Sequence, residues 1–305
     1  MAKAERIWVD GELVAWDDAR DHMLAHTLHY GLGAFEGIRA YEQEGGGRSA
    51  VFRLGEHIDR LFESCQICTI DVPYTRAQLL EACLETIRAN KLVEAYLRPV
   101  VYLGAGELGL GSLNNPVRTV IAAFPWGAYL GEEGLKKGIR AKVSGYRRGG
   151  VDAVMTKGKI NGQYTTSILA KRDAIKTGHD EAILLDPHGL VAEGTGENVF
   201  IAKGGALRTP PTSASILAGI TRDTVIQLAR EQGIEVIERS FTRDELWTAD
   251  EVFLTGTAAE VTPVREIDFR TIGAGEPGPI TRALQDRFFQ VVRGAGGHAD
   301  WLTQV

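Results

Sequence analysis

Residues 155–164 read Met-Thr-Lys-Gly-Lys-Ile-Asn-Gly-Gln-Tyr and place two lysines among small, flexible neighbours. A lysine that forms a Schiff base must be held at a fixed point and must spend time deprotonated. A position just before Tyr164, which opens a segment of helical periodicity, suits such a lysine. On composition alone, Lys157 and Lys159 are equal candidates, and an ordinary solvated lysine is the simpler interpretation of either.

A second polar segment follows at residues 192–200, Ala-Glu-Gly-Thr-Gly-Glu-Asn-Val-Phe. It places two carboxylates, Glu193 and Glu197, and the amide of Asn198 in a glycine-rich bend between two expected strands. A pyridine cofactor is a better electron sink when its ring nitrogen is protonated, and a neighbouring carboxylate keeps it so. Taken alone, the segment would be better interpreted as an exposed acidic turn.

A third segment, residues 217–223, reads Leu-Ala-Gly-Ile-Thr-Arg-Asp and leads into a clear helix. Gly219 and Thr221 at a helix start offer N–H groups, a hydroxyl and the positive end of the helix dipole, which together suit a phosphate. Gly256-Thr257, directly after an expected strand, offers a second set of N–H groups to the same phosphate. A simple N-cap is the competing interpretation.

The composition is that of an ordinary globular enzyme of one or two domains. The chain has 305 residues, of which 44% are hydrophobic and 24% are charged. Its formal net charge of -6 leaves no electrostatic footprint for nucleic acid. No apolar stretch approaches a membrane span, and the N-terminus lacks the apolar region of a secretion signal. Because the three cysteines cannot all pair, we expect a reducing, cytoplasmic location.

The hydrophobic periodicity predicts hairpins mixed with isolated helices, which indicates an α+β fold rather than a doubly wound sheet. We expect helices at 56–68, 77–90, 164–177 and 221–232. We expect a hairpin at 6–14 turning at Asp10-Gly11, and strands at 95–103, 117–124, 138–146, 182–185, 190–192, 199–202, 206–209, 234–238 and, as the final strand, 251–255. The aromatic, glycine-rich stretch after residue 124 predicts a linker, 125–135, between domains at 1–124 and 136–305.

Residues 104–109, Gly-Ala-Gly-Glu-Leu-Gly, match the dinucleotide-binding fingerprint and follow an expected strand. The fingerprint also needs a helix next and an acidic residue about 20 positions further on. Here a turn at 114–116 and another strand follow, and no Asp or Glu lies between Leu110 and Leu130. A nicotinamide site is therefore not expected.

Residues 65–68, Cys-Gln-Ile-Cys, lie at the end of an expected helix and on its apolar face. Reactive cysteine pairs usually sit at helix N-termini, and zinc would need a second pair, so we interpret both cysteines as core residues. His22, His26 and His29 cluster without the glutamate of a metal motif or an obvious remote ligand. No metal site is predicted.

Together, the three polar segments point to one protein family more specifically than any of them does alone. The chain resembles the class IV pyridoxal-phosphate aminotransferases, and within them the branched-chain amino-acid aminotransferases, over nearly its whole length. Further motifs that carry the resemblance are His29–Gly31, Phe35–Arg39, Glu56–Leu61, Tyr96–Pro99, Phe124–Tyr129 and Gly256–Val264. The resemblance implies a two-domain, fold-type IV enzyme. Its smaller N-terminal domain has a sheet and helices, its larger C-terminal, cofactor-binding domain is a pseudo-barrel, and the active site lies between them.

The resemblance implies pyridoxal 5′-phosphate as the cofactor. It also selects Lys159 over Lys157, because the family's Schiff-base lysine precedes its tyrosine by five positions. The other implied contacts to the ring are Tyr164 with the phenolic oxygen, Glu193 with the pyridine nitrogen, Glu197 and Asn198 as supports of that carboxylate, and Leu217 on the ring face. The phosphate would lie among Arg60, Gly219, Ile220, Thr221, Gly256 and Thr257.

The resemblance also implies a pocket that takes an apolar side chain and an anion in alternate half-reactions. Arg98 would meet the distal carboxylate of glutamate at the rim of aromatic walls, an arrangement that permits both. Tyr96 and the Thr257-Ala258 turn would bind the α-carboxylate. The walls would be Tyr30, Phe35, Trp126, Tyr129 and Tyr164, with the hydroxyls of Tyr30 and Tyr129 assisting Arg98.

The implied activity is transfer of an amino group between branched-chain L-amino acids and 2-oxoglutarate in a ping-pong cycle. Lys159, once displaced from the cofactor, would act as base and acid between Cα and the cofactor's C4′. The implied partners are these small molecules and further copies of the chain, as a homodimer or a hexamer. A loop near 104–111 would reach into the partner subunit's active site.

Two alternatives remain open on the sequence. Within the same fold, a D-amino-acid or (R)-amine aminotransferase, or an aminodeoxychorismate lyase, is possible in principle, although Tyr96-Leu97-Arg98 and residues 256–260 argue against it. From another class, a non-catalytic pyridoxal-phosphate carrier would bind the cofactor without responding to amino acids.

Overall fold

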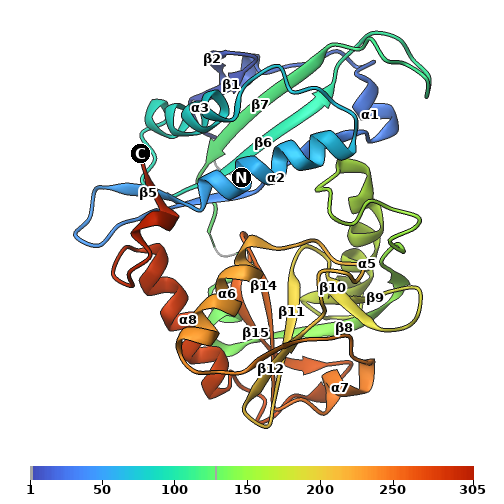
Figure 1. Ribbon diagram of the computed structural model, residues 1–305, viewed down its shortest axis with the longest axis vertical. Helices are drawn as coiled ribbons and strands as arrows, with labels where there is room; N and C mark the ends of the chain where they lie inside the picture. Colours follow the sequence, from blue (N-terminus) through green and yellow to red (C-terminus); the bar gives the residue numbers. More distant parts are fainter. Residues whose placement is uncertain (1–2, 128) are drawn as a thin grey trace. The chain divides into compact units, whose positions relative to one another are not determined.

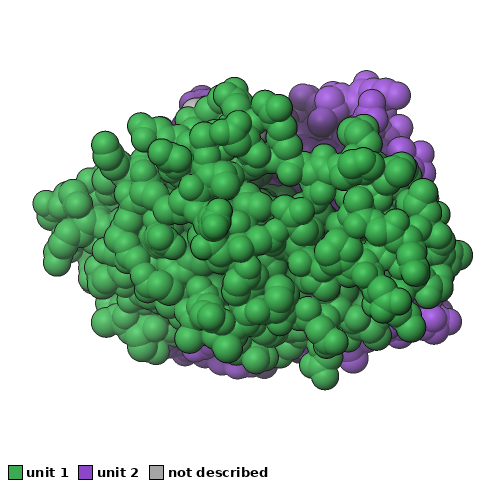
Figure 2. All heavy atoms as spheres, turned by 90° about the horizontal axis from the view of Figure 1, so that it is seen from above, with its two compact units in different colours: residues 1–126, 158–163, 292–305 green, residues 127–157, 164–291 purple. Residues whose placement is uncertain are grey.

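The computed structural model describes residues 3–127 and 129–305, so Ala128, inside the predicted linker, lies outside the described residues. The chain forms two compact units, which Figure 2 distinguishes by colour. Unit 1 contains the chain up to Trp126, residues 158–163 and residues 292–305, and unit 2 contains the rest. The predicted boundaries, 1–124 and 136–305, treat each domain as one continuous stretch. The units differ from them because two short segments of the second half belong to unit 1.

Backbone hydrogen bonds explain why these two segments belong to unit 1. The N–H of Phe35 donates to the carbonyl of Lys159 at 3.1 Å, and the N–H of Gly162 donates to the carbonyl of Gly31 at 2.9 Å. Near the C-terminus, β17 (Leu302–Gln304) pairs antiparallel with β5 (Ser49–Phe52). Such pairings join residues far apart in the chain, so local periodicity carries no sign of them.

Unit 1 is built on one sheet (Figure 1). Its strand order in the described residues is β17-β5-β4-β6-β7-β1-β2 with β3 beside β6, and every neighbouring pair is antiparallel. The other strands are β1 (Arg6–Val9), β2 (Glu12–Ala15), β3 (Gly33–Phe35), β4 (Ile38–Glu42), β6 (Ala95–Leu103) and β7 (Val117–Phe124). The α-helices are α1 (His26–Tyr30), α2 (Leu54–Ile67) and α3 (Arg76–Ala89), and the 3-10 helices are η1 (Trp16–Asp18), η2 (Asn161–Gln163) and η3 (Ala299–Trp301).

Local sequence signals predict much of unit 1. The β1–β2 hairpin turns at Asp10 and Gly11, whose φ angles of 47° and 100° are those that a type I′ turn requires. The expected strands at 95–103 and 117–124 coincide with β6 and β7. The expected helices at 56–68 and 77–90 are α2 and α3, each displaced by one or two residues.

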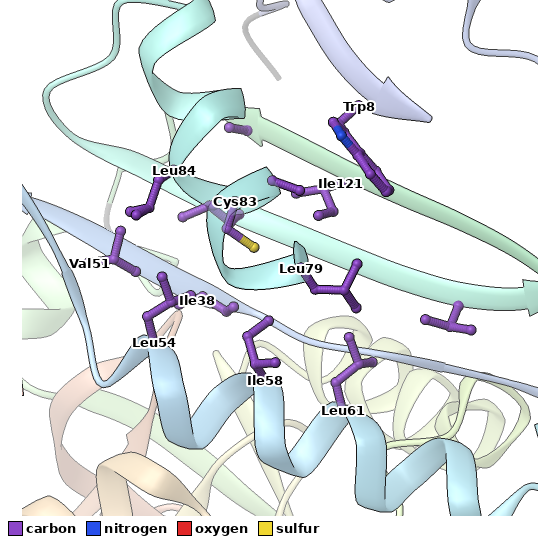
Figure 3. Close-up of a cluster of buried hydrophobic side chains, with 14 of the residues drawn as sticks. Trp8, Ile38, Val51, Leu54, Ile58, Leu61, Leu79, Cys83, Leu84 and Ile121 are labelled. Atoms are coloured by element: carbon purple, nitrogen blue, oxygen red, sulfur yellow. The ribbon is translucent and has the colours of Figure 1, made fainter. Parts of the chain in front are cut away.

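The core of unit 1 lies where α2 and α3 meet the sheet (Figure 3). Apolar residues recur on α2 every three or four positions, which buries one face of the helix. The buried cluster includes Leu54, Ile58, Leu61 and Cys65 of α2, Leu79, Cys83 and Ile87 of α3, and Ile38, Val51 and Ile121 of the sheet. Burial raises the pKa of the Cys65 thiol to about 12 and that of Cys68 to about 11, so both stay protonated, as core cysteines do.

Unit 2 contains a second sheet, whose order in the described residues is β10-β9-β8-β15-β14-β11-β12-β13 with β16 beside β15. Its strands are β8 (Ile139–Arg147), β9 (Glu181–Leu185), β10 (Val191–Gly194), β11 (Asn198–Lys203), β12 (Ala206–Thr209), β13 (Val236–Glu238), β14 (Glu251–Gly256), β15 (Glu260–Ile267) and β16 (Arg270–Thr271). Its helices are α4 (Glu132–Lys137), α5 (Tyr164–Lys176), α6 (Ile220–Glu231), α7 (Arg243–Trp247) and most of α8 (Pro279–Val292). Because β8 is parallel to both neighbours while most other pairs are antiparallel, the α+β prediction is confirmed.

The prediction that residues 251–255 form the final strand is wrong. β15 follows and lies inside the sheet, between β14 and β8. Its Pro263 is unusual in a central strand, because proline has no N–H to donate to a neighbouring strand. Proline is tolerated because pairing with β8 begins only at Val264, so Pro263 has a partner strand on one side, where it lies opposite Phe253.

The described residues include no helix that is both long enough and apolar enough to cross a membrane.

Candidate active site

Lys159 is held in unit 1 by both of its backbone polar groups. Its N–H donates to the hydroxyl of Ser64 on α2 at 2.9 Å, and its carbonyl accepts from Phe35 at the end of β3 at 3.1 Å. Its side-chain Nζ lies 5.0 Å from the centroid of the Phe35 ring. Two elements of unit 1 therefore fix the point from which this amine extends.

Lys157, two residues earlier, has a different environment. It belongs to unit 2, and its Nζ donates to the carbonyls of Ala214 at 3.0 Å and Ile216 at 2.8 Å. Burial lowers the pKa of this ammonium, and the nearby Glu193 carboxylate only partly opposes that effect. The structure thus distinguishes the two lysines, which were equal candidates on composition. Lys157 hydrogen-bonds to the loop that precedes α6.

Arg60 is anchored by a buried carboxylate. Its Nε donates to Oε1 of Glu36 at 2.7 Å and its Nη2 to Oε2 at 2.9 Å, while Nδ1 of His57 contacts Oε2 at 2.7 Å. Burial alone would raise the pKa of Glu36, but Arg60 and His57 outweigh it and hold the pKa far below its usual range. Burial lowers the pKa of His57, and the Glu36 carboxylate only partly opposes that effect.

The supports of Arg60 and Lys159 escaped sequence reasoning. Glu36, His57 and Ser64 are almost fully buried, and Ser64 also donates to the carbonyl of Arg60 at 2.8 Å. The missed signal is the spacing on α2: residues 57, 60 and 64 form a polar stripe along a helix that is otherwise buried in an apolar core. A buried polar stripe needs partners, which is a reason to look for a charged site beside it.

Several of the predicted substrate residues come together on unit 1. Arg98 of β6 donates to the Tyr96 hydroxyl at 3.0 Å, and its guanidinium lies 4.8 Å from the Phe35 ring centroid. Tyr96 also packs edge-on against Trp126, with centroids 4.4 Å apart. A Cβ at residue 37 would lie 2.0 Å from the Tyr96 hydroxyl, so only glycine leaves room for that ring. The buried Nε of Arg98 has no hydrogen-bond partner among the described residues.

Tyr30 is placed differently from this aromatic group. It ends α1, is 45% exposed, and its ring contacts are with His26 and His29. Tyr129, in unit 2, lies with its ring 5.1 Å from the Nζ of Lys171. The structure therefore assembles four of the predicted pocket residues, Phe35, Tyr96, Arg98 and Trp126, on one unit, and leaves Tyr30 and Tyr129 with other neighbours.

Glu193 of β10 is locked in unit 2 by three donors. Its Oε1 accepts from Nε of Arg148 at 2.6 Å, and its Oε2 accepts from the N–H of Leu217 at 2.9 Å and from Nδ2 of Asn198 at 3.2 Å. Both charged side chains are largely buried. Arg148 was missed at the sequence level, because it follows the expected strand 138–146 in a pair of arginines that resembles an exposed loop end.

Asn198 connects this carboxylate to the start of α6. Its Nδ2 also donates to the carbonyl of Leu217 at 2.9 Å. A Cβ on Gly219 would lie 2.0 Å from the Oδ1 of Asn198, so the glycine at the helix start is a steric requirement. The N-cap residue of α6 is Gly219, which has no side chain to cap the helix, and the first turn carries Ile220 and Thr221. A helix start of this kind favours an anion.

The remaining predicted residues of unit 2 lie at strand and helix ends. Gly256 ends β14, and Thr257 and Ala258 form the turn into β15. Tyr164 is the first residue of α5. Thr255 lies opposite Asn198 on the neighbouring strand, and its buried hydroxyl has no hydrogen-bond partner among the described residues. Glu197 is buried beside Glu193 and has a raised pKa of about 8.

Residues 33–267 match the protein family described as amino-transferase class IV. The branched-chain-amino-acid aminotransferase of Pseudomonas aeruginosa is 50% identical over 309 residues, which cover 100% of both chains. The crystal structure of the branched-chain amino acid aminotransferase of Escherichia coli has a TM-score of 0.96 at 44% identity, over 99% of each chain. The branched-chain amino acid aminotransferase of Thermobaculum terrenum, solved in its PLP-form, has a TM-score of 0.92 at 35% identity, over 99% of this chain and 98% of that chain.

The chain belongs to the class IV aminotransferases. The fold-type IV architecture that the sequence resemblance implied is thereby confirmed.

In this class IV aminotransferase, two of the three clustered histidines contact backbone carbonyls. His26 contacts the Gly109 carbonyl at 2.9 Å and His29 contacts the Met23 carbonyl at 3.0 Å. Within residues 3–127 and 129–305, no group of three or more His, Cys, Asp or Glu residues could hold a metal ion. Residues 104–109 are followed by a loop and then β7, not by the helix that a dinucleotide site requires.

Proposed function

We propose that this class IV aminotransferase uses pyridoxal 5′-phosphate to move amino groups between branched-chain L-amino acids and 2-oxoglutarate. The observation that carries the proposal is the pair of fixed groups, Lys159 clamped through its backbone and Glu193 locked by three donors. The similarity to branched-chain aminotransferases over the full chain supports the substrate class.

The residues present fit the cofactor. A carboxylate held by Arg148 suits a protonated ring nitrogen, the start of α6 with glycine at its N-cap suits a phosphate, and Lys159 supplies an amine. Bound pyridoxal phosphate supplies an aldehyde that joins amines covalently and a ring that accepts electrons. The residues that would hold it are Lys159, Tyr164, Glu193 with Glu197 and Asn198, Leu217, and, at the phosphate, Arg60, Gly219, Ile220, Thr221, Gly256 and Thr257.

The catalytic work of the chain is to hold and move protons. Lys159 would supply the amine that attaches the cofactor and, once the substrate has displaced it, would be the base that takes the Cα proton and the acid that gives one back. Glu193 would hold a proton on the ring nitrogen of the cofactor, and Arg148 fixes the carboxylate that would do so.

The substrate pocket explains how one site accepts two unlike side chains. Phe35, Tyr96 and Trp126 supply apolar area for a branched side chain, and Arg98 supplies a cation for the distal carboxylate of glutamate. The unpartnered Nε of Arg98 is a donor that such a carboxylate would satisfy. Tyr30 and Tyr129 would complete the walls, and Tyr96 with Thr257 and Ala258 would bind the α-carboxylate.

Exposed apolar side chains support a homo-oligomer, a dimer or a trimer of dimers. Around α1 and the 104–111 loop, the exposed residues are Met23, Leu24, Leu28, Leu108, Leu110 and Leu113, with Leu110 at 87% and Leu113 at 92% exposure. His26 joins α1 to that loop through the carbonyls of Gly104 and Gly109. Exposed apolar area of this kind usually marks an interface. The free, buried cysteines suit the proposed cytoplasmic location.

A half-reaction experiment tests the function. The purified holoenzyme is mixed with L-leucine or L-glutamate, without an acceptor, and the visible absorption of the cofactor is followed. We expect a spectral change with both, and little with D-alanine or (R)-1-phenylethylamine. A response to the latter two alone would favour the alternative activity of the same fold, and no response to any amine would indicate a non-catalytic carrier.

The lysine assignment has its own matched pair of variants. Lys159→Ala should lose turnover by several orders of magnitude, because no other amine is held at that point. Lys157→Ala should keep the spectral response and weaken cofactor binding, because it releases the loop before α6. The reverse result would overturn the assignment.

A further inference from the structure

Three buried carboxyl groups lie together in unit 2, and only two of them have a cation. Glu193 is paired with Arg148 at 2.6 Å, and Glu181 of β9 is paired with Lys171 of α5 at 2.5 Å. Glu181 is fully buried and also accepts from the Thr195 hydroxyl at 2.6 Å and the Ala182 N–H at 2.7 Å. The third carboxyl, Glu197, makes no ion pair with any residue in the described part of the chain.

The side chain of Glu197 is built into the turn between β10 and β11. Its Oε2 accepts the N–H of Gly196 at 3.1 Å. A Cβ on Gly194 would lie 2.7 Å from that same oxygen, so glycine there lets the carboxyl fold back against β10. With a residue exposure of 5%, the group is removed from water without a counter-charge. Burying an unpaired carboxylate is costly, and a proton removes the cost.

We propose that Glu197 is a positioning residue that keeps its proton at neutral pH, so that Glu193 is the only anion presented to the ring nitrogen. The inference rests on the proposed function, because it assigns a role to Glu197 at that cofactor.

The charged neighbours of Glu197 agree with a retained proton. Burial has the largest effect on its pKa, followed by the charge of Glu181 from β9; Lys171 from α5 opposes both, and Glu193 from β10 adds to them. The result is a pKa of about 8. Lys171 acts on Glu197 through its charge alone, because its hydrogen bond goes to Glu181 and not to Glu197.

The retained proton has a consequence for the reaction. Removal of the Cα proton drives an electron pair toward the ring, and a second anion behind Glu193 would oppose that shift of charge. Ionisation of Glu197 should therefore slow proton transfer at high pH. Glu197→Gln, which imitates the protonated acid but cannot ionise, should lack this alkaline loss.

The first test measures Tm of the holoenzyme from pH 5 to pH 9.5 for the wild type and for Glu197→Gln. A carboxyl with a raised folded pKa loses stability as pH rises from its unfolded value of 4.5 to its folded value of about 8. The Tm of Glu197→Gln minus that of the wild type should therefore increase up to about pH 8 and then level off. Glu235→Gln, an exposed position in the same unit, is the control and should give a flat difference.

Two further substitutions should shift, in opposite directions, the pH at which the Tm difference levels off. Glu181→Gln removes the largest charge that opposes ionisation and frees Lys171, so the levelling-off should occur at lower pH. Lys171→Met removes the compensating cation, so it should occur at higher pH. A flat Tm difference for Glu197→Gln, or a levelling-off that neither substitution moves, would overturn the proposal.

The kinetic test follows the half-reaction with L-leucine. The ratio of the rate of Glu197→Gln to that of the wild type should rise at least about threefold between pH 7 and pH 9, as expected if the ionised form is several-fold slower. A constant ratio would mean that Glu197 has no influence on proton transfer. If the wild type itself fails to respond to amino acids, the proposed function fails, whereas the Tm difference still reports whether Glu197 carries a proton.

Discussion

Each unit buries a carboxyl group near the candidate site, and the two groups have opposite pKa shifts. Glu36 in unit 1 is fully buried, yet its pKa is far below the ordinary range, whereas Glu197 in unit 2 has a pKa of about 8. Burial pushes both pKa values up, so burial does not explain the difference. The number of partners explains it: Glu36 has Arg60 and His57 to itself, whereas three carboxyl groups, those of Glu181, Glu193 and Glu197, share Arg148 and Lys171.

This contrast suits two different tasks. The ion pair of Glu36 fixes the guanidinium of Arg60, the residue that the proposed function places at the phosphate. In unit 2 the proposed task is to hold one carboxylate, that of Glu193, as the partner of a protonated ring nitrogen. A negative charge on Glu197 would disturb that arrangement, whereas a protonated, neutral Glu197 does not.

Replacing Glu36 should have the largest effect. Glu36→Ala leaves Arg60 as an uncompensated buried cation, which typically costs about 3–5 kcal/mol. Chemical denaturation with urea measures that loss. Glu56→Ala is a matched control on α2, because its pair with Arg53 has a carboxylate side chain that is 45% exposed and should contribute under about 1 kcal/mol. A loss for Glu36→Ala no larger than for Glu56→Ala would contradict the partner-count explanation.

The same pair predicts a pH dependence. A carboxylate whose folded pKa is lowered contributes stability above its unfolded pKa of 4.5 and loses it as pH falls toward the folded value. The stability difference between the wild type and Glu36→Ala should therefore be constant above pH 6 and shrink below pH 4.5. This trend is the reverse of the one expected for Glu197, which changes between pH 4.5 and about 8.

The two regions also differ in how much of them the sequence predicts. The β1–β2 hairpin, β6, β7 and the helices follow from local periodicity and turn residues, because those signals act over a few positions. The buried charges do not. Nothing local to Glu36 indicates that it meets Arg60, 24 positions away, and nothing local to Arg148 indicates Glu193, 45 positions away. Partners of that kind are set by strand pairing and helix docking, as was the place of β15 in its sheet.

For the candidate site, the residues alone gave candidate chemistry and left Lys157 and Lys159 equal. The resemblance to a family then selected Lys159. The structure adds a physical difference between the two lysines that neither the composition nor the resemblance supplied. The side chain of Lys157 donates to two backbone carbonyls, whereas Lys159 is held through its own backbone. In the structure Tyr30 and Tyr129 have other ring neighbours, so their assignment to the pocket stays a prediction.

Arg148→Met should have the next largest effect. The substitution leaves Lys171 as the cation paired within the cluster of three carboxyl groups, and Glu193 loses its charged donor. We expect kcat/KM for L-leucine to fall roughly 10- to 100-fold, the range typical for losing a partner that orients a site group. The levelling-off of the Glu197 stability difference should also move to higher pH. Arg147→Met is the control, since that side chain donates to a backbone carbonyl, that of Asp186. Equal losses in both variants would show that Arg148 acts on the fold and not on Glu193.

The smallest effect compares two buried threonine hydroxyls with unlike acceptors. Thr195 donates to the carboxylate of Glu181 at 2.6 Å, and Thr86 of α3 donates to the neutral carbonyl of Ala82 at 2.6 Å. A hydrogen bond to a charged group contributes about 1.5–3 kcal/mol and a neutral one about 1 kcal/mol. Thr195→Val should therefore cost more free energy of unfolding than Thr86→Val, as measured by urea denaturation at pH 7. Equal costs would mean that the Thr195 hydroxyl gains nothing from its carboxylate acceptor, which would contradict the contrast between charged and neutral acceptors.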